Sequence, residues 1–390
     1  MALGFGFNKA KVLAAAEKFV QQGKLQSAIA EYEKITKEDP KDLTVLNTIG
    51  DLYARVGENE RAAHYFRKVG DQYAQNGFTP KAIAIHKKLT NLVPGNLEYV
   101  NKLAELYSQQ GLFKDARQQY MQVADHLLKS GDNAQAARIF QRILELDPEN
   151  TATQSKLAEL YTKLGKKGEA RNIYYTAAET LYARGSYDSA EEALNKVLAL
   201  EPNEPSALLL RGMIAADSGD SLAAVQVLSQ IPDLDSRPEG LRALLRAKLQ
   251  AGTLEGVEGI ANKLLTAHND LGGVSGLAQW YAANHHVGDA MKLYERHAEV
   301  FLATGRASFQ ETLYSLIGPI KDNPEALTIM SRLMQRCGDS THSAEIMELQ
   351  AHACAQRGDL KQARDLYLRL SELEPENSLH SQNYKQIISR

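Results

Sequence analysis

The sequence predicts an all-α protein of stacked antiparallel helical hairpins, with about 22 helices along its 390 residues. Glycines such as Gly57, Gly111 and Gly165 recur with a 54-residue period, and prolines such as Pro94 and Pro148 keep the same step. Between these markers, apolar residues follow the spacing of one helix face. A fixed internal period is typical of repeat architectures, in which each unit covers its apolar face only with its neighbours.

The 54-residue period is a compound of two shorter intervals. A 34-residue interval separates Gly23 from Gly57, and a 20-residue interval leads from Gly57 to Gly77. The longer interval predicts a helical hairpin with glycine in its turn, because apolar and small residues recur at helical spacing on both sides. The shorter interval is explained if one long helix, at residues 59–76, belongs to two hairpins at once. This sharing predicts three helices in each 54-residue period.

The hairpins resemble the tetratricopeptide repeat, a 34-residue unit with large and small apolar residues, glycine and proline at fixed offsets. Residues 117–150 match this pattern nearly throughout, and residues 9–42 match it as well. The resemblance implies a right-handed α-solenoid, and the long shared helices are similar to those of soluble NSF attachment proteins. The matching positions of the first segment are Tyr120, Val123, Ala124, Leu127, Gly131, Ala136, Phe140, Ile143 and Pro148.

The regular pattern weakens after Gly219 and resumes towards the C-terminus. We therefore predict a regular repeat array at residues 1–228 and a second array with a terminal capping helix at residues 277–390. Residues 229–276 are interpreted as a degenerate repeat and a possible seam, because residues 229–240 and 265–276 are rich in Pro, Gly, Asp and Ser. The alternative for this segment is a pair of slightly longer loops.

Composition favours a soluble protein without nucleic acid as a partner. Lys and Arg total 45 against 48 Asp and Glu, so the chain lacks the basic excess that phosphate binding needs. We expect a cytoplasmic location, because the sequence has two cysteines, no apolar window long enough to span a membrane and no leader pattern. The first residues, MALGFGF, are interpreted as a cap on the first repeat, with a membrane or partner contact through Phe5 and Phe7 as the alternative.

No residue pattern points to catalysis, a cofactor or a metal. The sequence lacks the nucleophile elbow, the phosphate-binding loop and the paired-histidine zinc motif, and the repeats leave no room for a catalytic domain. Cys337, His342, His352 and Cys354 are of metal-ligating types, but His352 and Cys354 are two positions apart on a predicted helix and point to different sides. We expect Trp280 to pack inside a hairpin core.

Acidic residues occupy the ninth position of every predicted first helix in the regular array. This departs from the chaperone-tail clamp of the family, which uses Lys and Asn. One interpretation is an acidic stripe that attracts a basic segment of a partner. The other is that these acids are solvated and offset by a base one helical turn later, as Asp51 would be by Arg55 and Glu159 by Lys163. The ninth-position acids are Glu17, Asp51, Asp71, Glu105, Asp125, Glu159 and Glu179.

The sequence therefore predicts a non-catalytic scaffold that binds partner peptides or helices along a superhelical groove. The alternative is a regulatory or sensor solenoid whose curvature changes when a peptide or small ligand binds. The identity of the partner does not follow from the residues. The predicted partner-binding residues are Glu17, Asp51, Asp125, Glu159, Asn47 and Asn101.

Overall fold

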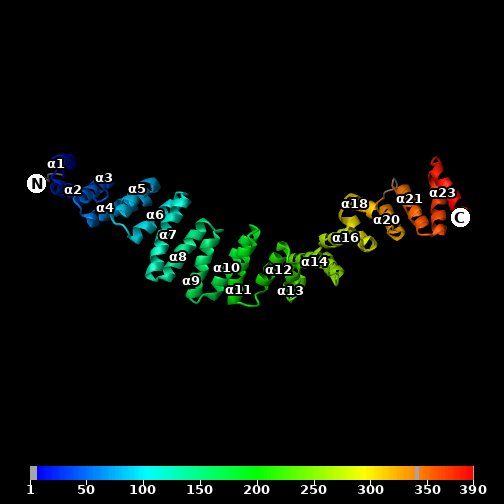
Figure 1. Ribbon diagram of the computed structural model, residues 1–390. Coiled ribbons are helices and arrows are strands. Elements are labelled where there is room, and N and C mark those ends of the chain that lie inside the picture. The colour runs from blue at the N-terminus through cyan, green and yellow to red at the C-terminus, as the bar shows by residue number, and fades with distance from the viewer. Residues whose placement is uncertain (1–6, 339–341, 390) are drawn as a thin grey trace. The chain divides into compact units, whose positions relative to one another are not determined.

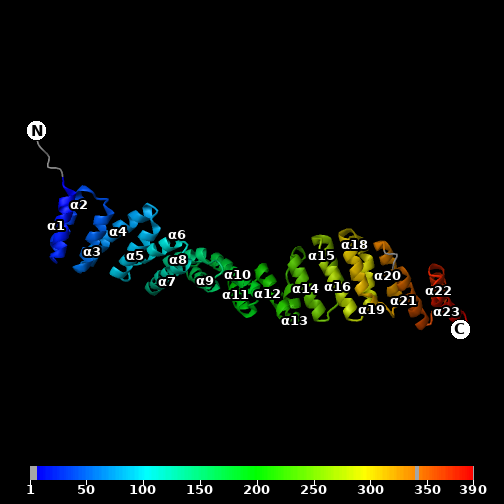
Figure 2. The ribbon, with the colours of Figure 1, turned by 90° about the horizontal axis from the view of Figure 1, so that it is seen from above.

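The computed structural model of the chain describes residues 7–338 and 342–389 (Figure 1). Over these residues it contains 23 α-helices, one short 3-10 helix and no strand. The helices form two compact units, Met1–Pro202 and Asn203–Arg390. Within each unit, consecutive helices lie side by side as hairpins (Figures 1 and 2). The predicted all-α fold of stacked hairpins is confirmed.

The first unit repeats one long helix and two short ones. Helices α4, α7 and α10 have 17, 18 and 17 residues, whereas the other helices of this unit have 13 or 14. The predicted shared helix at residues 59–76 is α4, so the compound 54-residue period is confirmed. The helices are α1 (Lys9–Gln21), α2 (Leu25–Glu38), α3 (Leu43–Arg55), α4 (Asn59–Gln75), α5 (Thr79–Leu92), α6 (Leu97–Gln109), α7 (Phe113–Ser130), α8 (Asn133–Leu146), α9 (Thr151–Lys163), α10 (Lys167–Ala183) and α11 (Tyr187–Leu200).

The spaced glycines end the helices because they adopt a left-handed backbone. At the end of α3, Gly57 has φ 82°, a conformation that costs other residues steric strain. The turn that follows is closed by two backbone hydrogen bonds, from Gly57 N to Ala54 O at 3.1 Å and from Glu58 N to Tyr53 O at 2.9 Å. This pattern satisfies carbonyl groups that the helix end would otherwise leave open. The 54-residue glycine period is therefore a period of helix ends.

Glycine also sets how closely the helices approach. A Cβ atom added to Gly50 would lie 2.8 Å from Cε1 of Phe66, so the ring of Phe66 packs directly on the backbone of α3. Gly70 supports His86 in the same way, with 2.8 Å from the added Cβ to Nε2. Phe66 and His86 are both buried. Each glycine thus makes room for a large side chain of the next helix.

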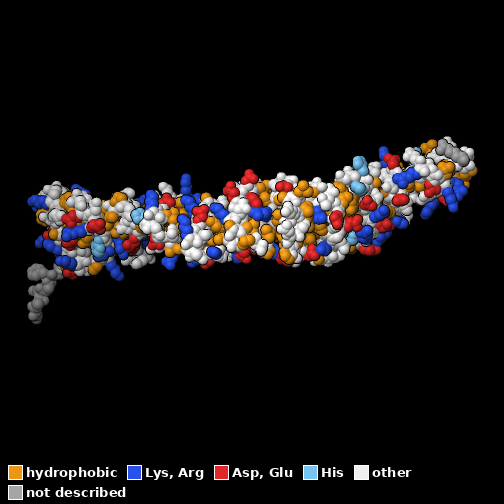
Figure 3. Space-filling model, turned by 60° about the horizontal axis from the view of Figure 1, so that its bottom comes forward, with side chains coloured by type: hydrophobic (Ala, Val, Ile, Leu, Met, Phe, Trp, Pro, Cys, Tyr) orange, Lys and Arg blue, Asp and Glu red, His pale blue; other side chains and the backbone are white. Residues whose placement is uncertain are grey.

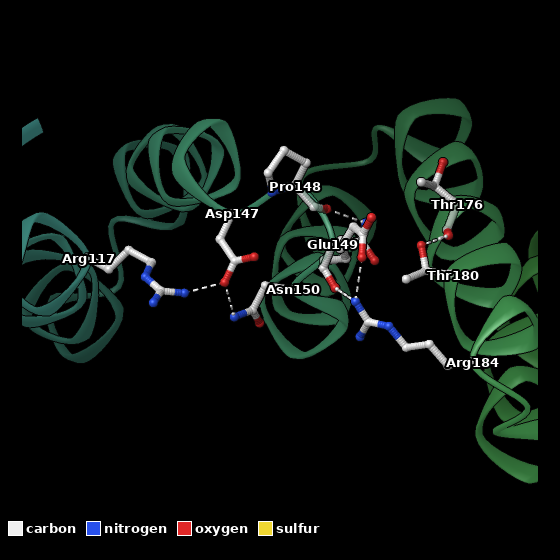
Figure 4. Close-up of polar contacts among 9 residues, drawn as sticks. Arg117, Asp147, Pro148, Glu149, Asn150, Thr176, Thr180 and Arg184 are labelled. Atoms are coloured by element: carbon white, nitrogen blue, oxygen red, sulfur yellow. Dashed lines mark hydrogen bonds and ion pairs between the residues drawn. The ribbon is translucent and has the colours of Figure 1, made fainter. Parts of the chain in front are cut away.

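The turn between α8 and α9 is tied to the long helices on both sides of it (Figure 4). Asp147 accepts hydrogen bonds from Arg117 of α7 and from Nδ2 of Asn150, the latter at 3.2 Å. Arg184, which follows α10, donates to Glu149 through its carboxylate at 2.8 Å and its carbonyl oxygen at 3.2 Å. These contacts hold one inter-repeat turn between two successive long helices.

The second unit is less regular than the first. Helix α13 has only 8 residues, and α18 is interrupted at Gly305, where the backbone is extended with φ −177° and ψ 89°. Ile231 and Leu234, in the segment after α13, are buried. The division into residues 1–228, 229–276 and 277–390 stays a prediction. The elements are α12 (Pro205–Ser218), α13 (Ser221–Leu228), the 3-10 helix (Leu234–Ser236), α14 (Pro238–Gln250), α15 (Val257–His268), α16 (Gly272–Ala283), α17 (Val287–Arg296), α18 (Ala298–Ser315), α19 (Ile317–Ile320), α20 (Pro324–Cys337), α21 (Ser343–Gln356), α22 (Leu360–Leu373) and α23 (Ser378–Ile388).

Two sequence predictions concern the ends of the chain. The predicted terminal capping helix is α23, which packs against α22. The predicted N-terminal cap lies outside the described residues except for Phe7, which is exposed. Among the helices of the described part, none is long and apolar enough to cross a membrane.

Candidate functional site

Ion pairs that recur with the 54-residue period join alternate helices of the first unit. In each pair, an acid at the predicted ninth position meets a base 37 positions later, two helices further along the chain. Two predicted site residues, Asp51 and Glu159, therefore have a partner within the fold. The pairs are Asp51–Lys88 at 2.9 Å, Glu105–Arg142 at 2.7 Å and Glu159–Lys196 at 3.3 Å.

Each base of these pairs also lies over an aromatic ring of the helix between. A half-exposed ion pair contributes about 0.2–1 kcal/mol, and a cation above a ring adds about 0.5–1 kcal/mol. The acids therefore help to hold successive repeats together. The distances to the ring centroids are 5.0 Å for Lys88 over Phe66, 6.0 Å for Arg142 over Tyr120 and 5.1 Å for Lys196 over Tyr174.

The prediction that a base one turn later offsets these acids is wrong. Asp51 pairs with Lys88 of α5 and Glu159 with Lys196 of α11, because the register of packed helices brings these bases closer. Glu17 and Asp125 are exposed, and no Lys or Arg among the described residues forms an ion pair with either. Among the four predicted site acids, these two are therefore the ones whose charge is least compensated.

The two predicted asparagines each have one buried, unused acceptor. Nδ2 of Asn47 donates to Asp51 at 3.1 Å, and Nδ2 of Asn101 donates to Glu105 at 3.0 Å. The Oδ1 atom of each asparagine is buried without a hydrogen-bond partner. An unmade hydrogen bond of this kind costs about 1–3 kcal/mol. A donor from a ligand could satisfy it.

Hollows recur at one place in the repeat, between two alternate helices and above the helix that connects them. Four examples lie in the described part of the chain, two in each unit. The α1–α3 hollow has a volume of about 330 Å³, the α4–α6 hollow about 530 Å³, the α14–α16 hollow about 440 Å³ and the α21–α23 hollow about 420 Å³. Their floor residues are, in that order, Tyr32, His86, Leu264 and Tyr367.

The α4–α6 hollow is polar and holds a buried histidine. His86 is only 1% exposed, and neither ring nitrogen has a hydrogen-bond partner. Its Nε2 lies 3.6 Å from Oδ1 of Asp71, and burial lowers the pKa of His86, although Asp71 acts in the opposite direction. The ring is therefore held mainly in its neutral form. The hollow is lined by Arg67, Asp71, Ala74, Gln75, His86, Glu98, Tyr99, Asn101, Lys102, Glu105 and Gln109.

Of the predicted site residues, the structure places Asn101 in the α4–α6 hollow and both Glu17 and Asp51 in the α1–α3 hollow. Asp125 lies on α7 and Glu159 on α9, outside the hollows described above. His86 was not among the predicted residues. The repeat could have drawn attention to His86, because the equivalent position one 54-residue period later holds Phe140. A histidine thus replaces an apolar aromatic residue at a core position of the repeat.

The α14–α16 hollow is mainly apolar. Leu245, Leu249 and Leu264 face it, and Trp280 lines one wall. Trp280 was predicted to pack inside a hairpin core, but it is only partly buried. One part of it packs against the core and its ring stacks on His286, with 6.3 Å between ring centroids.

Metal-ligating side chains do not gather in the part of the chain that the structure describes. No three of His, Cys, Asp and Glu in that part lie close enough together to hold a metal ion. Cys337 and Cys354 are both buried and form no disulfide, and burial raises the pKa of Cys354. The described residues thus offer binding surfaces made of polar and apolar side chains.

Two models of the tetratricopeptide repeat match the sequence. One matches residues 127–180, and the other matches residues 13–77 and 175–238. The chain is a tetratricopeptide repeat protein. A curated relative of this repeat protein, the protein CTR9 homolog of Arabidopsis thaliana, is 22% identical over 332 residues. That match covers 67% of this chain and spans only 30% of the relative's length.

Several solved structures are similar to this repeat protein at low scores. MamA has 20% identity and a TM-score of 0.24, covering 38% of this chain and 90% of its own. The Naa15/Naa10 complex bound to HypK-THB has 13% identity and a TM-score of 0.30, and the match covers 97% of this chain and 65% of the chain in that complex. Yeast Tom70 has 14% identity and a TM-score of 0.29, and the match covers 97% of this chain and 94% of Tom70. At these scores, the likenesses carry no argument about partners.

Proposed function

We propose that this repeat protein is a non-catalytic scaffold that binds extended or helical segments of partner proteins over its inter-repeat hollows. Tetratricopeptide repeats commonly mediate protein–protein interactions, and shallow surfaces between helices suit peptide segments better than small substrates. The observation that carries the proposal is the buried, unused Oδ1 of Asn101 in the α4–α6 hollow. A backbone N–H of a bound segment would supply the missing donor.

Two uncompensated acids of the first unit, Glu17 and Asp125, favour a partner segment with basic residues. On the face in Figure 3, acidic and basic side chains are mixed over the N-terminal helices. Glu17 and Asp125 are exposed and form no ion pair with a described base, whereas Glu98 of the α4–α6 hollow, although 66% exposed, pairs with Arg67 at 3.4 Å. Asp51 and Glu159 are weaker candidates because Lys88 and Lys196 already compensate them. Attraction of this kind mainly raises the association rate and the specificity.

The proposed site of action is the cytoplasm. Cysteines outside disulfides are typical of reducing compartments, and neither cysteine of this chain forms a disulfide. Their burial keeps them away from oxidants and disulfide exchange.

Selection of peptides tests the proposal directly. A random peptide library displayed on phage is panned against the full chain, and enriched peptides are titrated by fluorescence anisotropy. We expect Asn101→Ala to weaken binding about fivefold, the value of one hydrogen bond. Asn262→Ala, an exposed asparagine of α15, is the matched control and leaves the affinity unchanged.

Charge reversal separates the basic preference from the binding itself. Glu17→Lys with Asp125→Lys removes two acids without breaking an ion pair of the described residues. Weaker binding of basic peptides at low salt, with unchanged thermal unfolding, supports the preference. The scaffold proposal fails if no peptide is enriched, or if Asn101→Ala leaves every enriched peptide bound as tightly as before.

A further inference from the structure

The α14–α16 hollow has open space above an apolar floor. A Cβ atom added to Gly276 would meet no atom within 4 Å, so this wall of the hollow is unfilled. The sequence LAQWY at residues 277–281 aligns with LAELY at residues 103–107. Gly276 therefore stands where the α4–α6 hollow has Lys102, so no side chain at this position occupies the space above the apolar floor.

Trp280 enlarges the apolar surface of the same hollow. In the alignment it replaces Leu106, which is completely buried in the first unit. Trp280 is only partly buried and lines the hollow with Leu245 and Leu249. A partly exposed indole beside buried leucines is a typical anchor point for an apolar side chain of a partner.

The rim of this hollow is basic. Arg242 Nε lies 2.6 Å from Asp270 Oδ2, and Arg246 pairs through Nη2 with Oδ1 of Asp217. The two arginine side chains are 58% and 50% exposed, whereas the two acids are only 15% and 19% exposed. Each ion pair uses one nitrogen of its guanidinium. The arginines therefore cover the acids and present further N–H donors to solvent.

The charge balance is opposite to that of the α4–α6 hollow. Two basic and three acidic residues line the α4–α6 hollow, whereas two basic residues and one acid line the α14–α16 hollow. At equivalent positions, Asp71 of the first unit is replaced by Arg246. Exposed guanidinium groups next to an apolar surface complement a carboxylate next to an apolar side chain.

We propose that the α14–α16 hollow binds a bulky apolar side chain of a partner segment that carries acidic residues beside it. The apolar side chain fills the space next to Gly276 and contacts Trp280, while the carboxylates pair with Arg242 and Arg246. This inference goes beyond the proposed function, because it assigns a second site, in the other unit, with the opposite charge preference. The two sites are tested with different variants, so either can fail alone.

Trp280 is the single tryptophan of the chain, so its emission reports on this hollow. The full chain is titrated with a short synthetic peptide that has one phenylalanine between glutamates. Matched peptides carry lysines in place of the glutamates, or alanine in place of the phenylalanine. We expect the acidic phenylalanine peptide to change the emission and to bind at least about tenfold more tightly than either control peptide.

Gly276→Leu is the decisive variant, because an added Cβ meets no atom within 4 Å and we expect a leucine at this wall to occupy the space of the hollow. We expect this variant to bind the acidic phenylalanine peptide about tenfold or more weakly, with an unchanged circular dichroism spectrum. Arg246→Ala is expected to weaken binding about fivefold and to reduce its salt dependence. Asn101→Ala, in the other hollow, leaves this binding unchanged.

Three outcomes would overturn the inference. They are equal binding of the basic and acidic peptides, binding that persists in folded Gly276→Leu, and no change of Trp280 emission with any of the three peptides. None of these outcomes alters the result expected for Asn101→Ala with peptides selected on the whole chain.

Discussion

The α4–α6 and α14–α16 hollows occupy the same place in the repeat but differ in chemistry. Each lies between two alternate helices, with the floor residue supplied by the helix between them. The floor is His86 in one and Leu264 in the other. Because the backbone arrangement is shared, a few side chains per repeat decide what each hollow can bind. The same repeat architecture therefore presents different side-chain chemistry along a single chain.

The two hollows also differ in how glycine is used. In the first, Gly70 makes room for the buried ring of His86. In the second, Gly273 makes room for Leu264, and Gly276 leaves space that no side chain fills. At Gly70 and Gly273 the missing side chain allows a neighbouring side chain of the fold to pack on the helix backbone. At Gly276 the space is left open, and the proposed ligand side chain would occupy it.

The largest expected effect is loss of stability in Gly70→Ala and Gly273→Ala. The added Cβ would lie 2.8 Å from His86 Nε2 in the first variant and 2.7 Å from Leu264 Cδ1 in the second. Overpacking of this kind costs about 1–3 kcal/mol of unfolding free energy. Denaturant unfolding of the full chain measures the loss, and hydrogen exchange locates it to α4–α6 or α14–α16. Wild-type stability in both variants would show that the floor residues are free to move.

The second prediction concerns pH and His86. Burial lowers the pKa of His86 in the folded chain from 6.5, so below about pH 6.5 the unfolded chain binds a proton that the folded chain does not. Stability contributed by the neutral histidine is therefore lost as pH falls, with a slope of at most about 1.4 kcal/mol per pH unit. Phe66 and Phe140 occupy the corresponding position in other repeats. His86→Phe introduces the same residue type and should reduce this slope.

The measurement is the free energy of unfolding of wild type and His86→Phe between neutral and mildly acidic pH. His126→Gln, at an exposed position of α7, is the control and should keep the wild-type slope. If wild type and His86→Phe have the same slope, His86 takes up its proton in the folded state without a penalty.

The third prediction is a gain of stability in Gly276→Ala. Gly276 lies inside α16, and an added Cβ meets nothing within 4 Å. Alanine is favoured over glycine in a helix interior by about 0.8–1 kcal/mol, so the melting temperature should rise. A fall would mean that the space next to Gly276 is smaller than the structure indicates, which would weaken the proposed site.

The smallest expected effects come from the repeated ion pairs. Glu105 is 28% exposed and Glu159 is 54% exposed, so Glu105→Gln should cost more than Glu159→Gln. We expect losses of at most about 1 kcal/mol and about 0.5 kcal/mol, both smaller in high salt. Double-mutant cycles with Arg142→Met and Lys196→Met isolate the coupling energies. Equal, salt-independent losses would indicate that packing and not charge is responsible.

The helical period was readable from the sequence because it depends on local chemistry. Glycine alone adopts the backbone of the turn at Gly57 without strain, so the glycine spacing indicated the helix ends and the shared helix α4. The acidic positions could be placed on helices for the same reason. Their partners could not, because Lys88 lies 37 positions from Asp51 and only the packing of α3 with α5 brings them together.

The amino-acid sequence by itself therefore determined the all-α repeat, its 54-residue period and the residue types available on each helix. Tertiary structure alone decided which of those residues meet. It placed His86 beneath Asp71, left Oδ1 of Asn101 without a donor, and turned part of Trp280 towards a hollow. The physical reason is that helix formation follows from neighbours a few positions apart, whereas a binding surface depends on how separate helices approach one another.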